Sequence, residues 1–345
     1  MPTSFFNWLF ALFLARRVTA TPPAAQIVVT VETLGREHAG KSAARLMVAK
    51  VVQKGPQESG LELTSPDPRA LVKLVNVATA TYQGLQKAGM IATLEAEQML
   101  CHLCEADRLR AVLRQRDSIG HLLSFGEGSN DKRFEEQLVR HHENLTAADV
   151  IHVFVSCPPD DRPETLEQFE NELGLLTNNL RVALNHRRTV RKLAVAVILS
   201  KPDGVYGSAE EAKAALPDDR LRDLFRRLVL LLEGSERVGL AAVFVVSAFG
   251  YGKARLQEQT GQATGAQAGH SLFSRLDRKH ILKENAQPDP HNLTALVWWS
   301  LMAGLALKPA GAQGPEIART AKMLLSDLKA MGGWYVPLQC QPTRG

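Results

Sequence analysis

Apolar residues along this chain follow two patterns that alternate from one segment to the next. Short runs that are apolar or β-branched at nearly every position are typical of fully buried strands, and they cover residues 26–33, 150–156, 193–199 and 239–246. Segments with apolar residues at helical spacing predict helices, and they cover residues 43–53, 131–144, 163–188, 220–233 and 290–307. Strands separated by helices favour right-handed crossovers. We therefore expect an α/β fold with a mostly parallel central sheet and helices on both faces, and residues 239–246 as its last clear strand.

The segments between these elements predict an insertion and further helices. Residues 97–104 and 108–115 alternate apolar and polar positions around an acidic turn, which predicts a hairpin. Residues 70–85 predict an inserted helix before that hairpin. Residues 250–269, rich in Gly, Gln and Ala, predict a flexible loop, and residues 315–331 predict a last helix.

The chain divides into a main domain and two extensions. We assign residues 26–308 to the main domain, 1–25 to an N-terminal apolar helix and linker, and 309–345 to a C-terminal helix and tail. The most apolar segment, residues 5–14, is too short to cross a hydrocarbon layer, which needs about 20 residues. Two alternatives stay open for it: it packs on its own domain, or it lies on a membrane surface or a partner.

Composition and charge are those of a globular cytoplasmic protein. Hydrophobic residues make up 45% of the 345 and aromatic residues 6%, which suits helices packed on a buried parallel sheet better than a β-sandwich. The net charge of +5 is spread over interleaved acidic and basic residues, so we expect a solvated surface and no nucleic-acid partner. Cys101 and Cys104 have the spacing of half a zinc site, but no second pair completes it, and we expect reduced thiols.

A glycine-rich loop follows the first predicted strand. Residues 35–42 read Gly-Arg-Glu-His-Ala-Gly-Lys-Ser and match the phosphate-binding pattern G-x-x-x-x-G-K-[ST] without a mismatch. In this pattern backbone N–H groups converge on phosphate oxygens, Lys41 neutralises the β- and γ-phosphates, and the Ser42 hydroxyl coordinates Mg²⁺. The positive end of the following helix adds to the attraction. The predicted phosphate-binding residues are Gly35, Arg36, Glu37, His38, Ala39, Gly40, Lys41, Ser42 and Ala43.

Two short polar segments follow the third and fourth predicted strands. Ser200, Lys201 and Asp203 come after the third strand, and Ser247 and Ala248 come after the fourth. A carboxylate at Asp203 accepts hydrogen bonds from N1–H and the N2 amino group of guanine, whereas adenine presents an acceptor at N1. A backbone N–H at Ser247 or Ala248 can reach the guanine oxygen. Because ligands bind at the carboxyl ends of parallel strands, these residues predict GTP or GDP as the ligand.

With these motifs in this order, the chain resembles the Ras-like and translational GTPases, and in detail the bacterial double-GTPase group of the TRAFAC class. The resemblance covers about residues 26–307. It implies that Thr93 in the first switch coordinates Mg²⁺. It also implies a second switch with Asp117 and Gly120, followed by His121, which orients the attacking water. A rival alignment places the second switch at residues 124–127, where the Asp is missing.

The resemblance implies hydrolysis of GTP to GDP and phosphate with Mg²⁺, and a molecular switch whose loops are read by a protein partner. Two departures from the family bear on this expectation. Ser200 stands where Asn or Thr is usual, which is expected to weaken a contact that braces the glycine-rich loop, and Ala43 stands where many relatives carry a second hydroxyl. Two alternatives stay open: a nucleotide-binding scaffold with weak catalysis, and an ATP-using P-loop enzyme.

Overall fold

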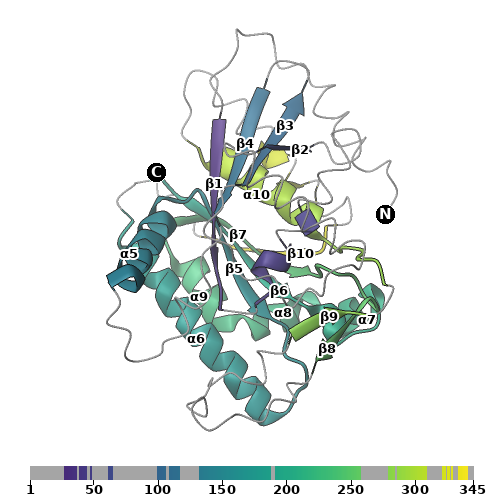
Figure 1. Ribbon diagram of the computed structural model, residues 1–345. Helices are drawn as coiled ribbons and strands as arrows, with labels where there is room; N and C mark the ends of the chain where they lie inside the picture. The colour runs from purple at the N-terminus through teal and green to yellow at the C-terminus, as the bar shows by residue number, and fades with distance from the viewer. Residues whose placement is uncertain are drawn as a thin grey trace.

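The computed structural model describes the chain in segments (Figure 1). These are residues 27–36, 39–44, 47–48, 61–64, 99–105, 109–116, 132–187, 191–257, 279–283, 286–308, 321–323, 325–326, 328 and 333–340. The apolar segment 5–14, the helix expected at 70–85 and both alternatives for the second switch lie outside the described residues and stay predictions.

An eight-stranded sheet forms the centre of the molecule, and its middle strands run parallel. The parallel strands, in spatial order, are β7 (Val238–Val246), β6 (Leu193–Ser200), β5 (Val150–Ser156), β1 (Ile27–Leu34) and β4 (Leu109–Arg116). Antiparallel strands extend the sheet at both sides: β3 (Met99–Glu105) and β2 (Leu61–Thr64) beyond β4, and β10 (Tyr335–Leu338) beside β7. The predictions of a mostly parallel sheet and of the hairpin formed by β3 and β4 are confirmed.

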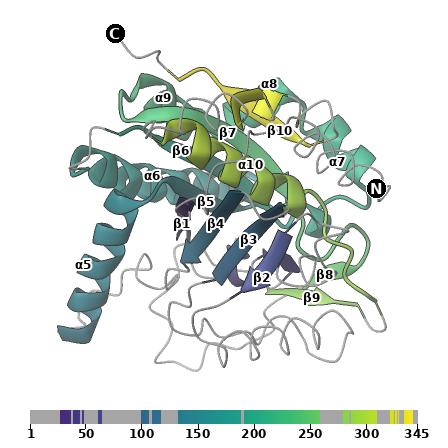
Figure 2. The same ribbon diagram turned by 90° about the horizontal axis from the view of Figure 1, so that it is seen from above.

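Helices cover both faces of the sheet (Figure 2). One face packs against α6 (Pro163–Asn185) and α9 (Arg226–Gly234), and the other packs against α10 (Leu293–Leu307) and the helical residues after Lys41. All residues of β5 and β6 are buried, because a strand between two helical layers has no solvent-facing side. This explains why their sequences do not alternate between apolar and polar residues.

A buried hydrogen bond joins α10 to the middle of the sheet. Nε2 of His152 in β5 lies 2.6 Å from the Ser300 hydroxyl of α10, and that hydroxyl donates to the Leu296 carbonyl at 2.7 Å. Burial lowers the pKa of His152 to about 3, so its ring is neutral at pH 7 and donates its N–H to Ser300. Although α10 is apolar on all sides, no helix in the described segments has the length and apolarity needed to cross a membrane.

Two helices, α8 (Asp218–Leu224) and α9, replace the single helix predicted at 220–233. Phe225 lies between them with φ −104° and ψ 20°, outside helical values. Its ring is fully buried, 5.9 Å from the ring of Phe169 in α6. The helical prediction for residues 220–233 is therefore confirmed except at Phe225, where tertiary packing interrupts a continuous apolar spacing.

Two further helices lie before β5 and after β6. The helix α5 (Lys132–Ala147) agrees with the helix predicted at 131–144. The helix α7 (Ala209–Ala215) was not predicted, and it begins after Ser208, whose hydroxyl accepts the N–H of Glu211 at 3.0 Å. A side-chain cap of this kind supports a helix that is only seven residues long.

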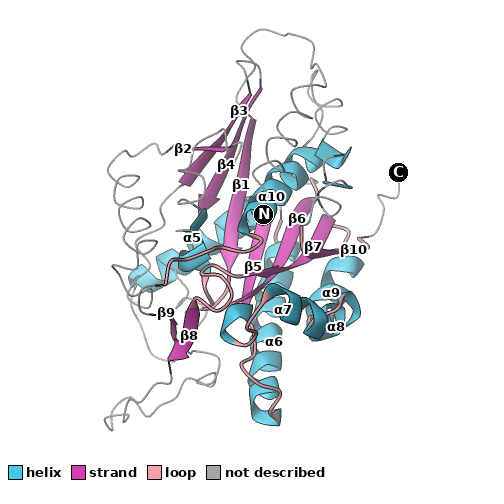
Figure 3. Ribbon diagram, turned by 90° about the vertical axis from the view of Figure 1, so that its right-hand side faces the viewer, coloured by secondary structure: helices cyan, strands magenta, loops and turns pink. Residues whose placement is uncertain are grey.

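A small hairpin, separate from the main sheet, lies between β7 and α10 in the chain (Figure 3). It consists of β8 (Ala254–Gln257) and β9 (Lys279–Leu282). Strand β8 lies beside η3 (Pro202–Gly204), the short helix that follows β6. The loop predicted at 250–269 therefore contains a strand, and residues 239–246 are not the last strand. Periodicity does not predict β8, since Ala-Arg-Leu-Gln is short and partly polar.

The C-terminal part of the chain returns to the sheet as β10, so the segment assigned to a helix and tail also supplies a strand. Asn292, just before α10, holds this segment: its amide donates to the carbonyls of Val245 at 2.9 Å and Trp334 at 2.6 Å. We did not predict β10, because it is four residues long and contains Pro337. Residues 321–323 are helical, within the helix predicted at 315–331.

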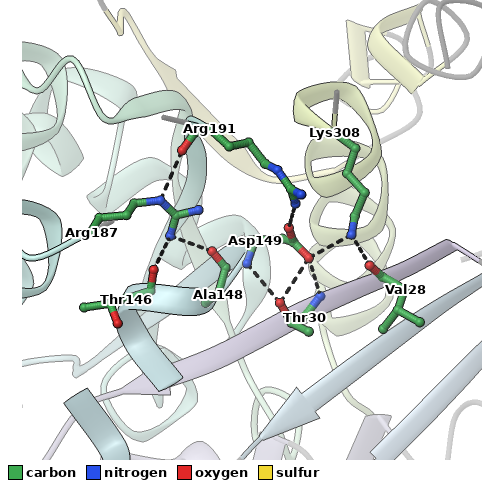
Figure 4. A network of polar contacts seen from close by, with 8 residues as sticks. All are labelled: Val28, Thr30, Thr146, Ala148, Asp149, Arg187, Arg191 and Lys308. Atoms are coloured by element: carbon green, nitrogen blue, oxygen red, sulfur yellow. Dashed lines mark hydrogen bonds and ion pairs between the residues drawn. The ribbon is translucent and has the colours of Figure 1, made fainter. Parts of the chain in front are cut away.

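Charged side chains, of which Asp149 and Arg187 are buried, join the amino ends of β5 and β6 to β1 and α10 (Figure 4). The Asp149 carboxylate accepts the N–H of Thr30 at 2.8 Å and pairs with Arg191 at 2.6 Å and with Lys308 at 3.1 Å. Arg187 donates to the Arg191 carbonyl at 3.1 Å. We call Thr30, Asp149, Arg187, Arg191 and Lys308 the Asp149 network.

Candidate functional site

The glycine-rich loop joins the carboxyl end of β1 to a helix that begins at Lys41. A Cβ atom on Gly35 would lie 2.8 Å from the Phe154 carbonyl oxygen of β5, so only glycine lets the two backbones approach this closely. Gly40 has φ +85°, in the region that favours glycine. The backbone therefore favours glycine at both positions of the motif, and the predicted convergence of N–H groups on phosphate oxygens stays a prediction. The helix starts two residues before the predicted 43–53, because apolar spacing does not mark its polar first residues.

Lys41 is buried and lies over the loop. Its ammonium group donates to the carbonyl oxygens of Gly35 at 2.5 Å and of Arg36 at 2.7 Å. The Arg36 carbonyl also accepts the N–H of Ala39 at 3.3 Å. Two carbonyl oxygens of the loop thus orient the ammonium group of its own lysine.

The first turn of the following helix presents Ser42 and Ala43. The Ala44 N–H closes the first helical bond to the Gly40 carbonyl at 2.9 Å. Backbone N–H groups of a first helical turn have no partners within their own helix and attract anions. Glu37 and His38 lie outside the described residues, so their predicted roles stay predictions.

A strand, a glycine-rich loop and a helix, set in a mostly parallel sheet with helices on both faces, are the elements of the α/β P-loop NTPase fold. The described chain has this fold. The loop leaves β1, which lies between β5 and β4 in the interior of the sheet. The carboxyl ends of β5, β6 and β7 meet at the same edge, where open α/β sheets bind their ligands.

Ser200 joins the end of β6 to the glycine-rich loop. Its hydroxyl lies 2.7 Å from the Ala39 carbonyl and 3.0 Å from the Val155 carbonyl of β5, and it donates to them. We expected a weakened brace because Ser replaces the usual Asn or Thr. The structure shows that the short hydroxyl does reach the loop at normal hydrogen-bond distance, and the expected weakness of this brace relative to Asn or Thr stays a prediction.

Lys201 turns the chain from β6 toward η3 in a left-handed conformation, with φ 60° and ψ 33°. Its Cε would lie 3.8 Å from a Cβ placed on Gly40. The Lys201 side chain therefore lies beside Gly40, and Ser200 and Lys201 are both next to the phosphate-binding motif.

Asp203 is a buried acid in η3, with 5% of its surface exposed. Burial raises its pKa to about 6, although a hydrogen bond with Ser247 and the charge of Lys201 act in the opposite direction. The Ser247 hydroxyl in turn accepts the N–H of Gly250 at 2.8 Å. The predicted residues of the two polar segments are thus brought together at the ends of β6 and β7.

Ser247 and Ala248, the two residues predicted to donate a backbone N–H to a base, differ in the hydrogen bonds of these N–H groups. The Ser247 N–H donates to the His291 carbonyl at 3.2 Å, and the His291 N–H donates back at 2.9 Å. Among the described residues, the Ala248 N–H has no hydrogen-bond partner. Ala248 is therefore the residue of this pair whose amide fits a ligand acceptor.

The candidate residues of the two switches lie elsewhere in the chain. Thr93, Asp117, Gly120, His121 and the rival segment at 124–127 are outside the described residues, so the structure does not test them. In contrast, it adds Glu172 of α6, whose carboxylate lies 3.9 Å from the Arg36 guanidinium. No signal in the sequence links Arg36 to a residue in the middle of a helix more than 130 positions away.

No family model and no curated protein sequence matches this chain. Among solved structures it is similar to Sup35 complexed with GMPPNP, with 12% identity and a TM-score of 0.31, covering 69% of this chain and 42% of that one. It is also similar to Aquifex aeolicus Era bound to GDP and AlF4−, with 14% identity and a TM-score of 0.30, covering 65% and 52%. Era in complex with MgGDPNP and nucleotides of 16S ribosomal RNA has 15% identity, the same score and the same coverages.

This chain spans less than half of the Sup35 chain and about half of the Era chains. At these scores the likeness carries no argument, and the assignment of the fold depends on the strand order and on the glycine-rich loop. The resemblance to the double-GTPase group stays a prediction.

Proposed function

We propose that this chain binds GTP and GDP together with Mg²⁺ and hydrolyses GTP. One observation carries the proposal: the Ser200 hydroxyl at the end of β6 donates to the Ala39 carbonyl of the glycine-rich loop at 2.7 Å. The loop that would hold phosphates and the segment that ends in the buried acid Asp203 are therefore parts of one site. A nucleotide lying along this edge would meet Lys41 with its phosphates and Asp203 with its base.

Guanine fits the base end better than adenine does. An ionised Asp203 offers only acceptors, which match N1–H and the N2 amino group of guanine and oppose the N1 acceptor of adenine. The Ala248 N–H would donate to the guanine oxygen. A buried acid with a raised pKa, at the edge of the sheet where α/β proteins bind ligands, is typical of a functional site.

The phosphate end is built from the backbone and from two side chains. Lys41 would neutralise phosphate charge from a position already fixed by the Gly35 and Arg36 carbonyls. The Ser42 hydroxyl is a hard oxygen donor at the mouth of the loop and fits Mg²⁺, which when bound supplies positive charge beside the phosphates. Thr93 would be the second protein ligand, as the resemblance implies.

Hydrolysis would proceed by in-line attack of water on the γ-phosphate, with Lys41 stabilising the charge that develops. His121 would orient the water, and the loops around Thr93 and Gly120 would be held by the γ-phosphate and released after its loss. A protein partner would read these loops. We place the protein in the cytoplasm and leave residues 5–14 as a candidate contact with the membrane surface, which co-sedimentation of the full chain with anionic vesicles tests.

Competition and phosphate release test the function. We expect GTP and GDP to displace a fluorescent GDP analogue while excess ATP does not, and phosphate release from GTP to require Mg²⁺ and His121. Displacement by ATP with equal potency would favour an ATP-using enzyme. Tight GTP binding with no phosphate release would favour a nucleotide-binding scaffold instead.

A further inference from the structure

Arg36, the second residue of the glycine-rich loop, directs its charged side chain into the protein, toward α6. The Arg36 guanidinium lies 3.9 Å from the Glu172 carboxylate, and the two side chains are only 5% and 2% exposed. Glu172 belongs to the buried side of α6, which packs on the face of the sheet opposite α10. The two groups attract each other as an ion pair at a distance beyond a hydrogen bond, and separating them would leave a charge in a poorly solvated place.

The backbone of Arg36 holds the loop in its phosphate-binding shape. Its carbonyl accepts two hydrogen bonds, from the Ala39 N–H and from the Lys41 ammonium. The same residue is therefore tied to α6 by its side chain and to Lys41 by its main chain. A shift of the Arg36 peptide would move the acceptor that orients the Lys41 ammonium.

We propose that Glu172 is a positioning residue of the nucleotide site, which acts through Arg36 to hold Lys41 over the glycine-rich loop. This inference rests on the proposed function and adds to it a residue that lies outside the phosphate-binding motif. Glu172 does not touch the nucleotide. It anchors the backbone whose carbonyl holds the phosphate-binding lysine.

A purely stabilising ion pair is the alternative, and a double substitution separates the two roles. Glu172→Met alone leaves the Arg36 charge buried without its carboxylate, so it lowers both stability and affinity. The double variant Arg36→Met, Glu172→Met removes both charges of the pair together, and stability should recover. If the pair positions Lys41, affinity for a fluorescent GDP analogue should stay about tenfold weaker than in the parent, because small displacements of a binding group are costly.

The matched control is Arg191→Met, which breaks the ion pair with Asp149 at the other end of the strands. This variant should lose stability and bind the GDP analogue as tightly as the parent does. The parent must also bind the analogue in the same experiment. If it does not, the proposed function fails, and the affinity comparison says nothing about Glu172.

A second readout does not need a nucleotide. The rate at which an amine-reactive reagent labels Lys41 in the full nucleotide-free chain, followed by mass spectrometry, reports how firmly the ammonium is held. We expect faster labelling of Lys41 in both Glu172→Met and the double variant, and an unchanged rate in Arg191→Met. Recovery of both affinity and labelling rate in the double variant would overturn the inference and leave the pair a stabilising contact only.

Discussion

Buried acids lie at both ends of the parallel strands, but their surroundings differ. At the amino ends, Asp149 accepts a backbone N–H and pairs with Arg191 and Lys308, all within the protein (Figure 4). At the carboxyl ends, Asp203 has a raised pKa because burial outweighs the stabilisation of its charge by Ser247 and Lys201. In the first arrangement, three groups of the protein compensate the carboxylate charge. In the second, burial keeps the charged form unfavourable. A perturbed acid of this kind is the more typical of a functional site, and the proposed function assigns it to the base of the nucleotide.

The largest expected effect on stability comes from a substitution at the amino ends of the parallel strands. Asp149→Ala removes a buried carboxylate that accepts the Thr30 N–H and pairs with the partly exposed Arg191 and Lys308, and losing hydrogen bonds to a charged group of this kind costs about 1.5–3 kcal/mol. Urea denaturation measures this loss in the free energy of unfolding. At temperatures where the variant is folded, its affinity for GDP should equal that of the parent. An equal loss of affinity would remove the distinction between the two ends.

The next effect concerns the close approach of the glycine-rich loop to β5. In Gly35→Ala the new Cβ would lie 2.8 Å from the Phe154 carbonyl oxygen, so the loop must shift and GDP affinity should fall about 100-fold. The matched control is Gly234→Ala, where an added Cβ meets no atom within 4 Å. Its affinity should not change. Isothermal titration calorimetry measures both variants, and tight binding by Gly35→Ala would show that the loop does not hold the ligand.

The raised pKa of Asp203 predicts a pH dependence of binding. Guanine needs the ionised carboxylate, so the dissociation constant for GDP should be constant above pH 6 and rise about tenfold per pH unit below it. Protonation of the phosphates also changes the dissociation constant with pH. The variant Asp203→Asn measures this phosphate contribution alone, because it lacks the carboxyl group. Equal pH profiles for the parent and Asp203→Asn would contradict the role of Asp203.

The raised pKa of Asp203 predicts that stability changes with pH in the direction opposite to binding. A raised pKa means that the protonated acid favours the folded state, so this contribution is present at low pH and is lost as the pH rises through about 6. Asp203→Asn should therefore raise the melting temperature of the nucleotide-free protein at pH 8 while it weakens GDP binding. Thermal denaturation at pH 5 and pH 8 measures the difference.

The smallest expected effect comes from the Ser200 hydroxyl, which joins the end of β6 to the glycine-rich loop. Ser200→Ala removes a buried hydroxyl that reaches the Ala39 and Val155 carbonyls, which costs about 1 kcal/mol of stability and a few-fold in GDP affinity. Ser200→Thr keeps the hydroxyl and should behave like the parent in the same titrations. If Ser200→Thr bound GDP more weakly than the parent, the size of the side chain would matter rather than its hydrogen bonds.

The elements that could be predicted from the sequence are those whose signal is local. Strands such as β5 and β6 are apolar at nearly every position, and the glycine-rich loop is specified by Gly35, Gly40 and Lys41. The strand β10 was missed because its partner β7 lies about 90 residues earlier and its own four residues include Pro337. Short edge strands depend on contacts made across the fold, which periodicity does not reveal.

In the candidate site, too, the residues with a local signal could be predicted and the long-range contacts could not. Asp203 and Ser247 follow strand ends, where a motif can be recognised, and the structure brings them together. The pairing of Arg36 with Glu172 depends on where α6 crosses the loop. The choice of Ala248 over Ser247 as the free amide depends on the bridge to His291. Such three-dimensional contacts have no spacing rule in the sequence.

The most direct test of the account is a calorimetric titration of the nucleotide-free protein with GDP and, separately, with ADP, in the parent and in Lys41→Ala and Asp203→Ala. We predict that the parent binds GDP far more tightly than ADP, that Lys41→Ala loses GDP binding, and that Asp203→Ala loses the preference between the two bases. Binding of GDP by Lys41→Ala as tight as that of the parent, or an unchanged preference for GDP in Asp203→Ala, would contradict a guanine nucleotide held between these two residues.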